Sequence, residues 1–99
     1  MQLPIIVDNT QIAAFCREHH ITKLAFFGSV LTDQFRPDSD VDVLVEFDPN
    51  HIPTLLDVVR MERELSSIFD HKVDMRTPKD LSRYFRDDVM KTALVQYAA

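Results

Sequence analysis

A short polar segment in the first half of the chain has the residue types of a cation site. Asp40 and Asp42 stand at the start of the apolar run VDVLVEF, residues 41–47. Side chains two residues apart in a strand project to the same side, so the two carboxylates are expected next to each other. Close carboxylates repel each other, which raises a pKa unless a cation lies between them. The spacing therefore predicts a site for Mg²⁺, a hard ion that takes oxygen ligands and often shares them with substrate phosphates.

The residues that precede this pair are suited to an anion. Gly28, the only glycine of the chain, and Ser29 directly follow the apolar run KLAFF, residues 23–27. Glycine lets the backbone approach a ligand closely, and Ser29 offers a hydroxyl and an amide. A short helix that begins near Ser29 would also favour anions at its N-terminus, although Ser29 could serve as its cap as well. We therefore expect a phosphate site at Gly28 and Ser29, beside the metal site.

Asp74 is the candidate for a third carboxylate. It lies in the segment HKVDMRT, residues 71–77, which is the next predicted strand along the chain. If that strand neighbours the one that begins at Val41, Asp74 comes to lie beside Asp40 and Asp42. Three carboxylates can bind two metal ions, one that activates an attacking hydroxyl and one that binds the triphosphate and the leaving pyrophosphate. The simpler alternative is an aspartate that faces water.

Other metal sites are disfavoured. Asp38, Asp40 and Asp42 match the first ligands of a calcium-binding EF-hand loop, but Val43 replaces its glycine and Pro49 its closing glutamate. The histidines have no paired spacing on a shared element, which argues against zinc; they are His19, His20, His51 and His71.

The apolar pattern predicts alternating helices and strands around these residues. Helices are expected from Asp8 or Asn9 to about His20, briefly near Ser29, from Thr54 to about Phe69, and from Thr77 and Pro78 through Val89, Met90, Ala93, Leu94 and Tyr97. Strands are expected at 23–27, from Val41 and at 71–77. The predicted fold class is α/β (α+β): a small mixed sheet of about three strands flanked by helices, in the order α-β-α-β-α-β-α, within a single domain 1–99.

The composition limits the environment and the partners. The chain has 99 residues, of which 45% are hydrophobic and 27% are charged, as is common in soluble globular proteins. No apolar run approaches the ~20 residues of a membrane span, and the N-terminus lacks the pattern of a signal peptide. We therefore expect a cytoplasmic protein in which Cys16 is a buried packing residue. The net charge of −5 argues against direct nucleic-acid binding.

The motifs together resemble a known superfamily. Gly28-Ser29, then Ser39-Asp40-Val41-Asp42 and an apolar strand, and finally a lone aspartate in a VDM strand are similar to the DNA polymerase beta-like nucleotidyltransferases. The branch that the chain resembles most is the minimal nucleotidyltransferases, the antitoxins of HEPN/MNT toxin-antitoxin pairs, over about residues 22 to 98. One departure is Thr32-Asp33, where many members carry Arg-Gly, which leaves the loop after the phosphate turn with less backbone freedom.

The resemblance implies an activity and a partner. Asp40, Asp42 and Asp74 would be both the catalytic residues and the ligands of two Mg²⁺ ions, and Gly28 and Ser29 would contact the nucleotide. ATP would be the substrate, and AMP would pass to a tyrosine hydroxyl of a cognate HEPN ribonuclease toxin. That transfer would silence the toxin in a hetero-oligomeric complex, as in a type VII-like antitoxin.

Two alternatives remain open. The chain could neutralise its partner by binding alone, although idle carboxylates are costly to keep unpaired. It could also act on a small molecule or an RNA end, but related enzymes of that kind generally add a domain that holds the acceptor. A chain of 99 residues leaves little room for one, which favours an acceptor on a bound protein.

Overall fold

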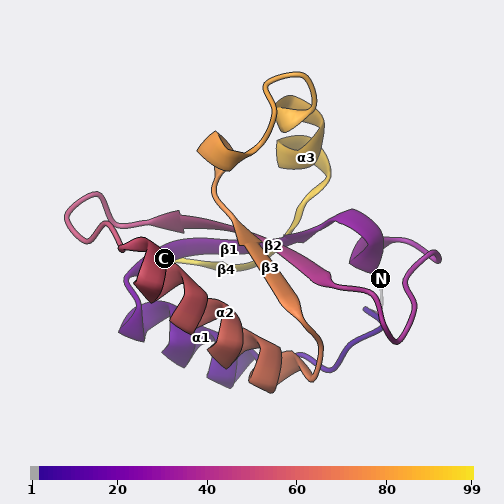
Figure 1. Cartoon of the computed structure of the whole chain (residues 1–99), viewed down its shortest axis with the longest axis horizontal. Coiled ribbons are helices and arrows are strands. Elements are labelled where there is room, and N and C mark those ends of the chain that lie inside the picture. The colour runs from indigo at the N-terminus through magenta and orange to yellow at the C-terminus, as the bar shows by residue number, and fades with distance from the viewer. Residues whose placement is uncertain (1–2) are drawn as a thin grey trace.

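The computed structural model describes residues 3–99, so Met1 and Gln2 of the expected domain 1–99 lie outside the described residues. The elements follow in the order α1 (Asn9–Glu18), β1 (Ile21–Phe27), the 3₁₀ helix η1 (Gly28–Leu31), β2 (Val41–Phe47), α2 (Leu55–Phe69), β3 (Val73–Arg76), the 3₁₀ helix η2 (Pro78–Asp80), α3 (Arg86–Thr92) and β4 (Leu94–Ala98). The strands form one mixed sheet in the order β3-β2-β1-β4 (Figure 1). β1 is antiparallel to β2 and β4, whereas β2 and β3 are parallel.

The hydrophobic core lies between the sheet and the helices α1 and α2, which cover the same face (Figure 1). Val41, Val43 and Val45 alternate along β2 and are fully buried on this face, as the sequence pattern predicts. Residues of both helices complete the core, among them Ile12, Phe15, Cys16, Met61, Leu65 and Phe69. The acidic positions of β2 must therefore project from the opposite face.

The ends of α1 and α2 follow from local hydrogen bonding. The carboxylate of Asp8 caps α1 by accepting from two backbone amides, and Thr54 and Asp57 form a reciprocal capping box at the start of α2. α2 ends at Asp70, which adopts a left-handed conformation with φ of 55°. Both helices confirm the sequence prediction. No helix within residues 3–99 combines the length and the apolar character that crossing a bilayer requires.

The mixed sheet flanked by helices is confirmed, but it has four strands rather than about three, and the expected final helix forms only over Arg86–Thr92. The segment after β3 forms η2, then α3, which ends at Thr92, and then a fourth strand. Leu94 and Val95 pair with Phe26 and Ala25 of β1, so the segment is extended. Without β4, the backbone amides and carbonyls along this side of β1 would lack sheet partners, and this long-range pairing prevails over the local helical pattern. Tyr97 packs against the core from a strand instead.

The second face of the sheet is covered only in part. α3 stands on this side, opposite α1 and α2 (Figure 1). None of its residues is buried, and both Tyr84 and Phe85 just before it are exposed. The side of the sheet that carries Asp42 is therefore open to ligands.

Cys16 has no role at that open face. It is fully buried in α1, on the other side of the sheet. Burial raises the pKa of its thiol to about 12, so the thiolate is scarce at neutral pH. The side chain is a packing residue, as expected from the sequence.

Candidate functional site

Asp42 and Asp74 meet through the register of three adjacent strands. Asp42 on β2 is opposite Asp74 on the parallel strand β3 and opposite Phe27 at the end of β1. Gly28 comes directly after Phe27, so the glycine turn and the second carboxylate flank Asp42 on its two sides. Asp40 immediately precedes β2, where its side chain is about half exposed. The fold thus gathers Gly28 and the three predicted acids at one end of the sheet.

Gly28 leaves space that the carboxylate of Asp42 occupies. A Cβ atom built on Gly28 would lie 2.5 Å from Oδ2 of Asp42, so any other residue type would require the carboxylate to move. Gly28 also has a φ of 77°, a left-handed conformation that glycine adopts without strain. Glycine is therefore favoured at this position for two separate reasons.

The electrostatics of Asp42 favour a bound cation. Partial burial raises the pKa of Asp42, and the negative charges of Asp74 and Asp40 raise it further, whereas Arg76 lowers it. Ionised Asp42 is thus destabilised by its surroundings in the absence of a neutralising ion. Carboxylate oxygens on adjacent strands are the donors that Mg²⁺ prefers, so the residues present fit this ion.

Two basic residues that the sequence analysis missed lie beside the acids. Nη2 of Arg76 donates to Oδ2 of Asp74 at 3.1 Å, and Nζ of Lys72 lies 4.0 Å from Oδ2 of Asp40. Arg76 follows Asp74 by two residues on β3, and side chains two residues apart in a strand lie on the same face. The sequence could therefore have predicted the contact between Arg76 and Asp74. These side chains offset part of the negative charge in the metal-free state.

A different group of ligands lies at the opposite end of β1. Within residues 3–99, only Glu18, His19 and Glu64 have possible metal-ligand atoms that all lie within 4.8 Å of one another. Nε2 of His19 is 2.6 Å from Oε2 of Glu64, which joins α1 to α2. Histidine spacing within a single element cannot predict this contact, because its two residues belong to different helical segments. The three candidate catalytic acids are more widely spread, so binding one ion would draw them closer together.

The turn after Gly28 is stabilised without the Arg-Gly pair of related sequences. Thr32 donates from its hydroxyl and from its backbone amide to the carbonyl oxygen of Ser29, each at 2.9 Å. The hydroxyl of Thr32 also accepts from the amide of Gln34. η1 is only four residues long, and no side chain caps it, so Ser29 is not a helix cap. Phosphate binding here would depend on local amides and the Ser29 hydroxyl rather than on a helix dipole.

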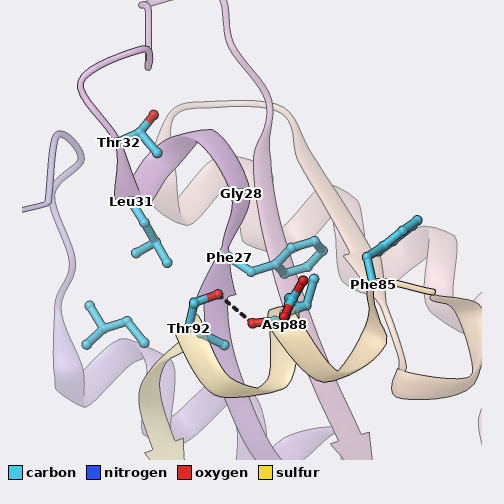
Figure 2. A pocket seen from close by; sticks show the side chains of 10 residues that line it. Phe27, Gly28, Leu31, Thr32, Phe85, Asp88 and Thr92 are labelled. Atoms are coloured by element: carbon cyan, nitrogen blue, oxygen red, sulfur yellow. Dashed lines mark hydrogen bonds between the residues drawn. The ribbon is translucent and has the colours of Figure 1, made fainter. Parts of the chain in front are cut away.

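Two adjoining pockets open at this end of the sheet. One, of about 310 Å³, is lined by Asp42, Asp74, Arg76, Asp80 and Leu81 together with two aromatic rings, Phe27 and Phe85. The other, of about 600 Å³, lies between η1 and α3 beside Gly28. Figure 2 shows this larger pocket. Phe27 and Phe85 line both, so one elongated ligand could occupy the two pockets at once.

Replacing Asp42 with asparagine is expected to stabilise the metal-free protein at neutral pH. The pKa of Asp42 in the folded protein is raised above the ordinary value of 3.8. Below pH 3.8 the carboxyl is protonated in both the folded and the unfolded state, so it does not lower the free energy of unfolding. As the pH rises toward the pKa of the folded state, the loss of stability grows, and above that pKa it is complete. The Tm difference between Asp42→Asn and wild type should therefore be near zero at about pH 3.5 and positive at about pH 7. Calorimetry over this range checks this, with Asp38→Asn as the exposed control. A less stable Asp42→Asn protein at neutral pH would contradict it.

Gly28→Ala should destabilise the protein through both backbone strain and a clash with Asp42. A left-handed backbone costs a non-glycine residue about 1–2 kcal/mol, and the clash adds to that cost. In an Asp42→Ala background, Gly28→Ala should then cost only the backbone strain, because the clashing carboxylate is absent. Urea denaturation of both single variants and the double variant measures this coupling. Strict additivity would show that the two residues do not interact.

Comparison with known proteins agrees with this geometry. A family model described as a nucleotidyltransferase domain matches residues 9–95. The protein adenylyltransferase MntA of Thermococcus cleftensis is 31% identical over 74 residues, which cover 75% of this chain and 69% of that protein.

Solved structures share the fold. A toxin-antitoxin crystal structure with AMP-PNP matches with a TM-score of 0.74 and 17% identity, over 94% of this chain and 75% of that one. A complex of the tri-AMPylated Shewanella oneidensis HEPN toxin with its MNT antitoxin matches with a TM-score of 0.60 and 18% identity, over 92% of this chain and 70% of that one. At these identities the likeness concerns the fold. The family match over residues 9–95 and the identity to MntA show that the chain belongs to the nucleotidyltransferase domain family and is a homologue of the MntA protein adenylyltransferases.

Proposed function

We propose that residues 1–99 act as one minimal nucleotidyltransferase domain that transfers AMP from MgATP to a tyrosine hydroxyl of a cognate HEPN ribonuclease toxin. The modification would silence the toxin in a cytoplasmic complex of the two proteins, which makes the chain a type VII-like antitoxin. The observation that carries the proposal is the position of Asp42, between Asp74 on β3 and the space left by Gly28. Its relatives support it, since one is a protein adenylyltransferase and one antitoxin is bound to an AMPylated HEPN toxin.

Each candidate residue has a part in this reaction. Asp40, Asp42 and Asp74 would bind two Mg²⁺ ions, and Gly28 and Ser29 would contact the phosphates of ATP. Bound Mg²⁺ supplies charge neutralisation for the triphosphate and lowers the pKa of the attacking hydroxyl. The raised pKa of Asp42 supports this assignment, because a cation relieves the burial and repulsion that raise it.

The proposed transfer is a nucleophilic displacement at the α-phosphorus of ATP. The tyrosine oxygen forms a bond to the α-phosphorus, and the bond between that phosphorus and the oxygen bridging to the β-phosphate breaks. Pyrophosphate leaves, and the proton of the tyrosine hydroxyl passes to the carboxylate of Asp74. Nη2 of Arg76 donates to Oδ2 of that carboxylate, so Oδ1 is the oxygen that would accept the proton.

The surroundings of the acids suit an acceptor carried by a protein. Tyr84 is 83% exposed and Phe85 is 50% exposed, and Met90 of α3 adds a third exposed apolar side chain nearby in the chain. Phe85 also lines the pocket that contains Asp42 and Asp74. Exposed aromatic side chains of this kind are enriched in protein interfaces. A protein surface that covers them would bring its hydroxyl close to the carboxylates.

The proposal predicts label on the toxin when ATP carries a radioactive α-phosphate. With Mg²⁺ and the cognate HEPN protein, wild type should transfer the label, and Asp42→Asn should lower the rate at least about 100-fold because a metal ligand is lost. Asp38→Asn is the matched control, since Asp38 is exposed in the loop before β2 and lines none of the pockets near the acids. Replacing the acceptor tyrosine of the toxin with phenylalanine should remove the label.

Other outcomes would point to the alternatives. A stable complex that carries no label, and in which the toxin is nevertheless inactive, would show an antitoxin that acts by binding alone. Label that appears on RNA or on a small molecule, and not on the toxin, would show a nucleotidyltransferase with a different acceptor.

A further inference from the structure

The larger pocket, between η1 and α3, lies beside the candidate metal site, and none of Asp40, Asp42 and Asp74 lines it. Its walls are mainly apolar and come from two segments far apart in the sequence (Figure 2). Phe27 and Leu31 belong to the first segment, and the second contributes Phe85, Val89, Ala93 and Leu94. The volume of about 600 Å³ lies within the range of about 300–1,000 Å³ that is usual for small-molecule sites.

We propose that this pocket binds the nucleobase of the nucleotide substrate and that Asp88 selects a base with an amino group, as in adenine. This inference rests on the proposed function, because it assumes that the triphosphate lies at the acids. Gly28 lines the pocket and also contacts Asp42, so the two sites are adjacent. A nucleotide with its phosphates at Gly28 would extend its base into the pocket between η1 and α3.

The aromatic rings at the junction suit the flat part of the ligand. Phe27 and Phe85 line both pockets, and Phe85 is half exposed although it is large and apolar. The faces of nucleobases stack on such rings, and this contact tolerates any base. The rings therefore contribute affinity, whereas selection among bases needs a polar group.

Asp88 is the polar group that can supply selection. In Figure 2 its side chain points toward Phe27, across the pocket. Asp88 takes part in none of the ion pairs formed within residues 3–99. The hydroxyls of Thr32 and Thr92 donate to the backbone oxygens of Ser29 and Asp88, so they are engaged in the turn and in α3. The carboxylate can only accept hydrogen bonds when ionised, and an exocyclic amino group donates them.

The charge of Asp88 also fixes the direction of the nucleotide. A carboxylate repels the triphosphate, whereas the cation expected at Asp42 attracts it. The base is the uncharged end of ATP, so it is the end that can approach Asp88. The opposite orientation would place phosphates against a carboxylate that no cation neutralises.

Calorimetric titration of the whole chain with ATP and Mg²⁺ tests the pocket with two matched pairs of variants. Phe85→Ala and Asp88→Ala should each weaken binding about tenfold. Tyr84→Ala and Asp87→Ala should bind as wild type does, because these adjacent exposed residues do not line the pocket. Inorganic tripolyphosphate with Mg²⁺ lacks a base, so Phe85→Ala should not weaken its binding. Circular dichroism confirms that each variant is folded.

A second ligand tests the role of the amino group. Purine riboside triphosphate lacks the amino group of ATP, so wild type should bind it about tenfold more weakly. In Asp88→Ala the two nucleotides should bind equally. If 2′-deoxy-ATP, and not purine riboside triphosphate, shows the loss, Asp88 contacts the ribose and the assignment to the base is wrong.

The results separate this inference from the proposed function. In one outcome, Phe85→Ala and Asp88→Ala bind ATP as wild type does, but Asp40→Ala/Asp42→Ala does not. The base then lies outside this pocket, and the proposed binding of the nucleotide at the acids is supported. If the pocket variants lose ATP but wild type does not label the toxin, the pocket assignment stands and the proposed transfer fails. If wild type does not bind ATP at all, both are wrong.

Discussion

Repulsion between Asp42 and its neighbours Asp40 and Asp74 is the physical constraint that shapes the candidate site. The fold places Asp42 directly opposite Asp74 on the adjacent parallel strand, with Asp40 just ahead. Partial burial and both neighbours raise the pKa of Asp42, and Arg76 offsets only part of this. Such an arrangement costs stability in the absence of a cation, and a bound divalent cation would relieve that cost. The proposed binding of MgATP would thus offset an unfavourable contribution to folding.

The rest of the fold accommodates this cluster. The main cluster of buried apolar side chains lies on one face of the sheet, between α1, α2 and the buried valines of β2, and Asp42 projects from the other face. Gly28 lies on the side of Asp42 that faces β1, where a larger residue would force the carboxylate to move. α3 is short and without buried residues, and it forms one wall of the larger pocket. Stability comes from one face of the sheet, and ligand binding is assigned to the other.

Local patterns explain why much of this could be predicted from the sequence. Alternation along 41–47 identified β2 and the direction of Asp42, and the capping residues Asp8 and Thr54 identified α1 and α2. β4 was missed because Leu94 and Tyr97 also fit a helical spacing, and only pairing with β1, about 70 residues earlier, decides between the two. Arg76 and Lys72 were missed as partners of the acids, and the two pockets depend on tertiary packing that no single segment encodes.

The most direct measurement is a crystal structure with Mn²⁺ in place of Mg²⁺ and a non-hydrolysable ATP analogue, in which anomalous scattering locates the metal. If the carboxylates form the metal site, Mn²⁺ should bind to carboxylate oxygens of Asp42 and of at least one of Asp40 and Asp74. The triphosphate of the analogue should lie next to Gly28. The protein offers a competing position at Glu18, His19 and Glu64, at the opposite end of β1. Manganese found only there, with no metal at Asp42, would contradict the central claim.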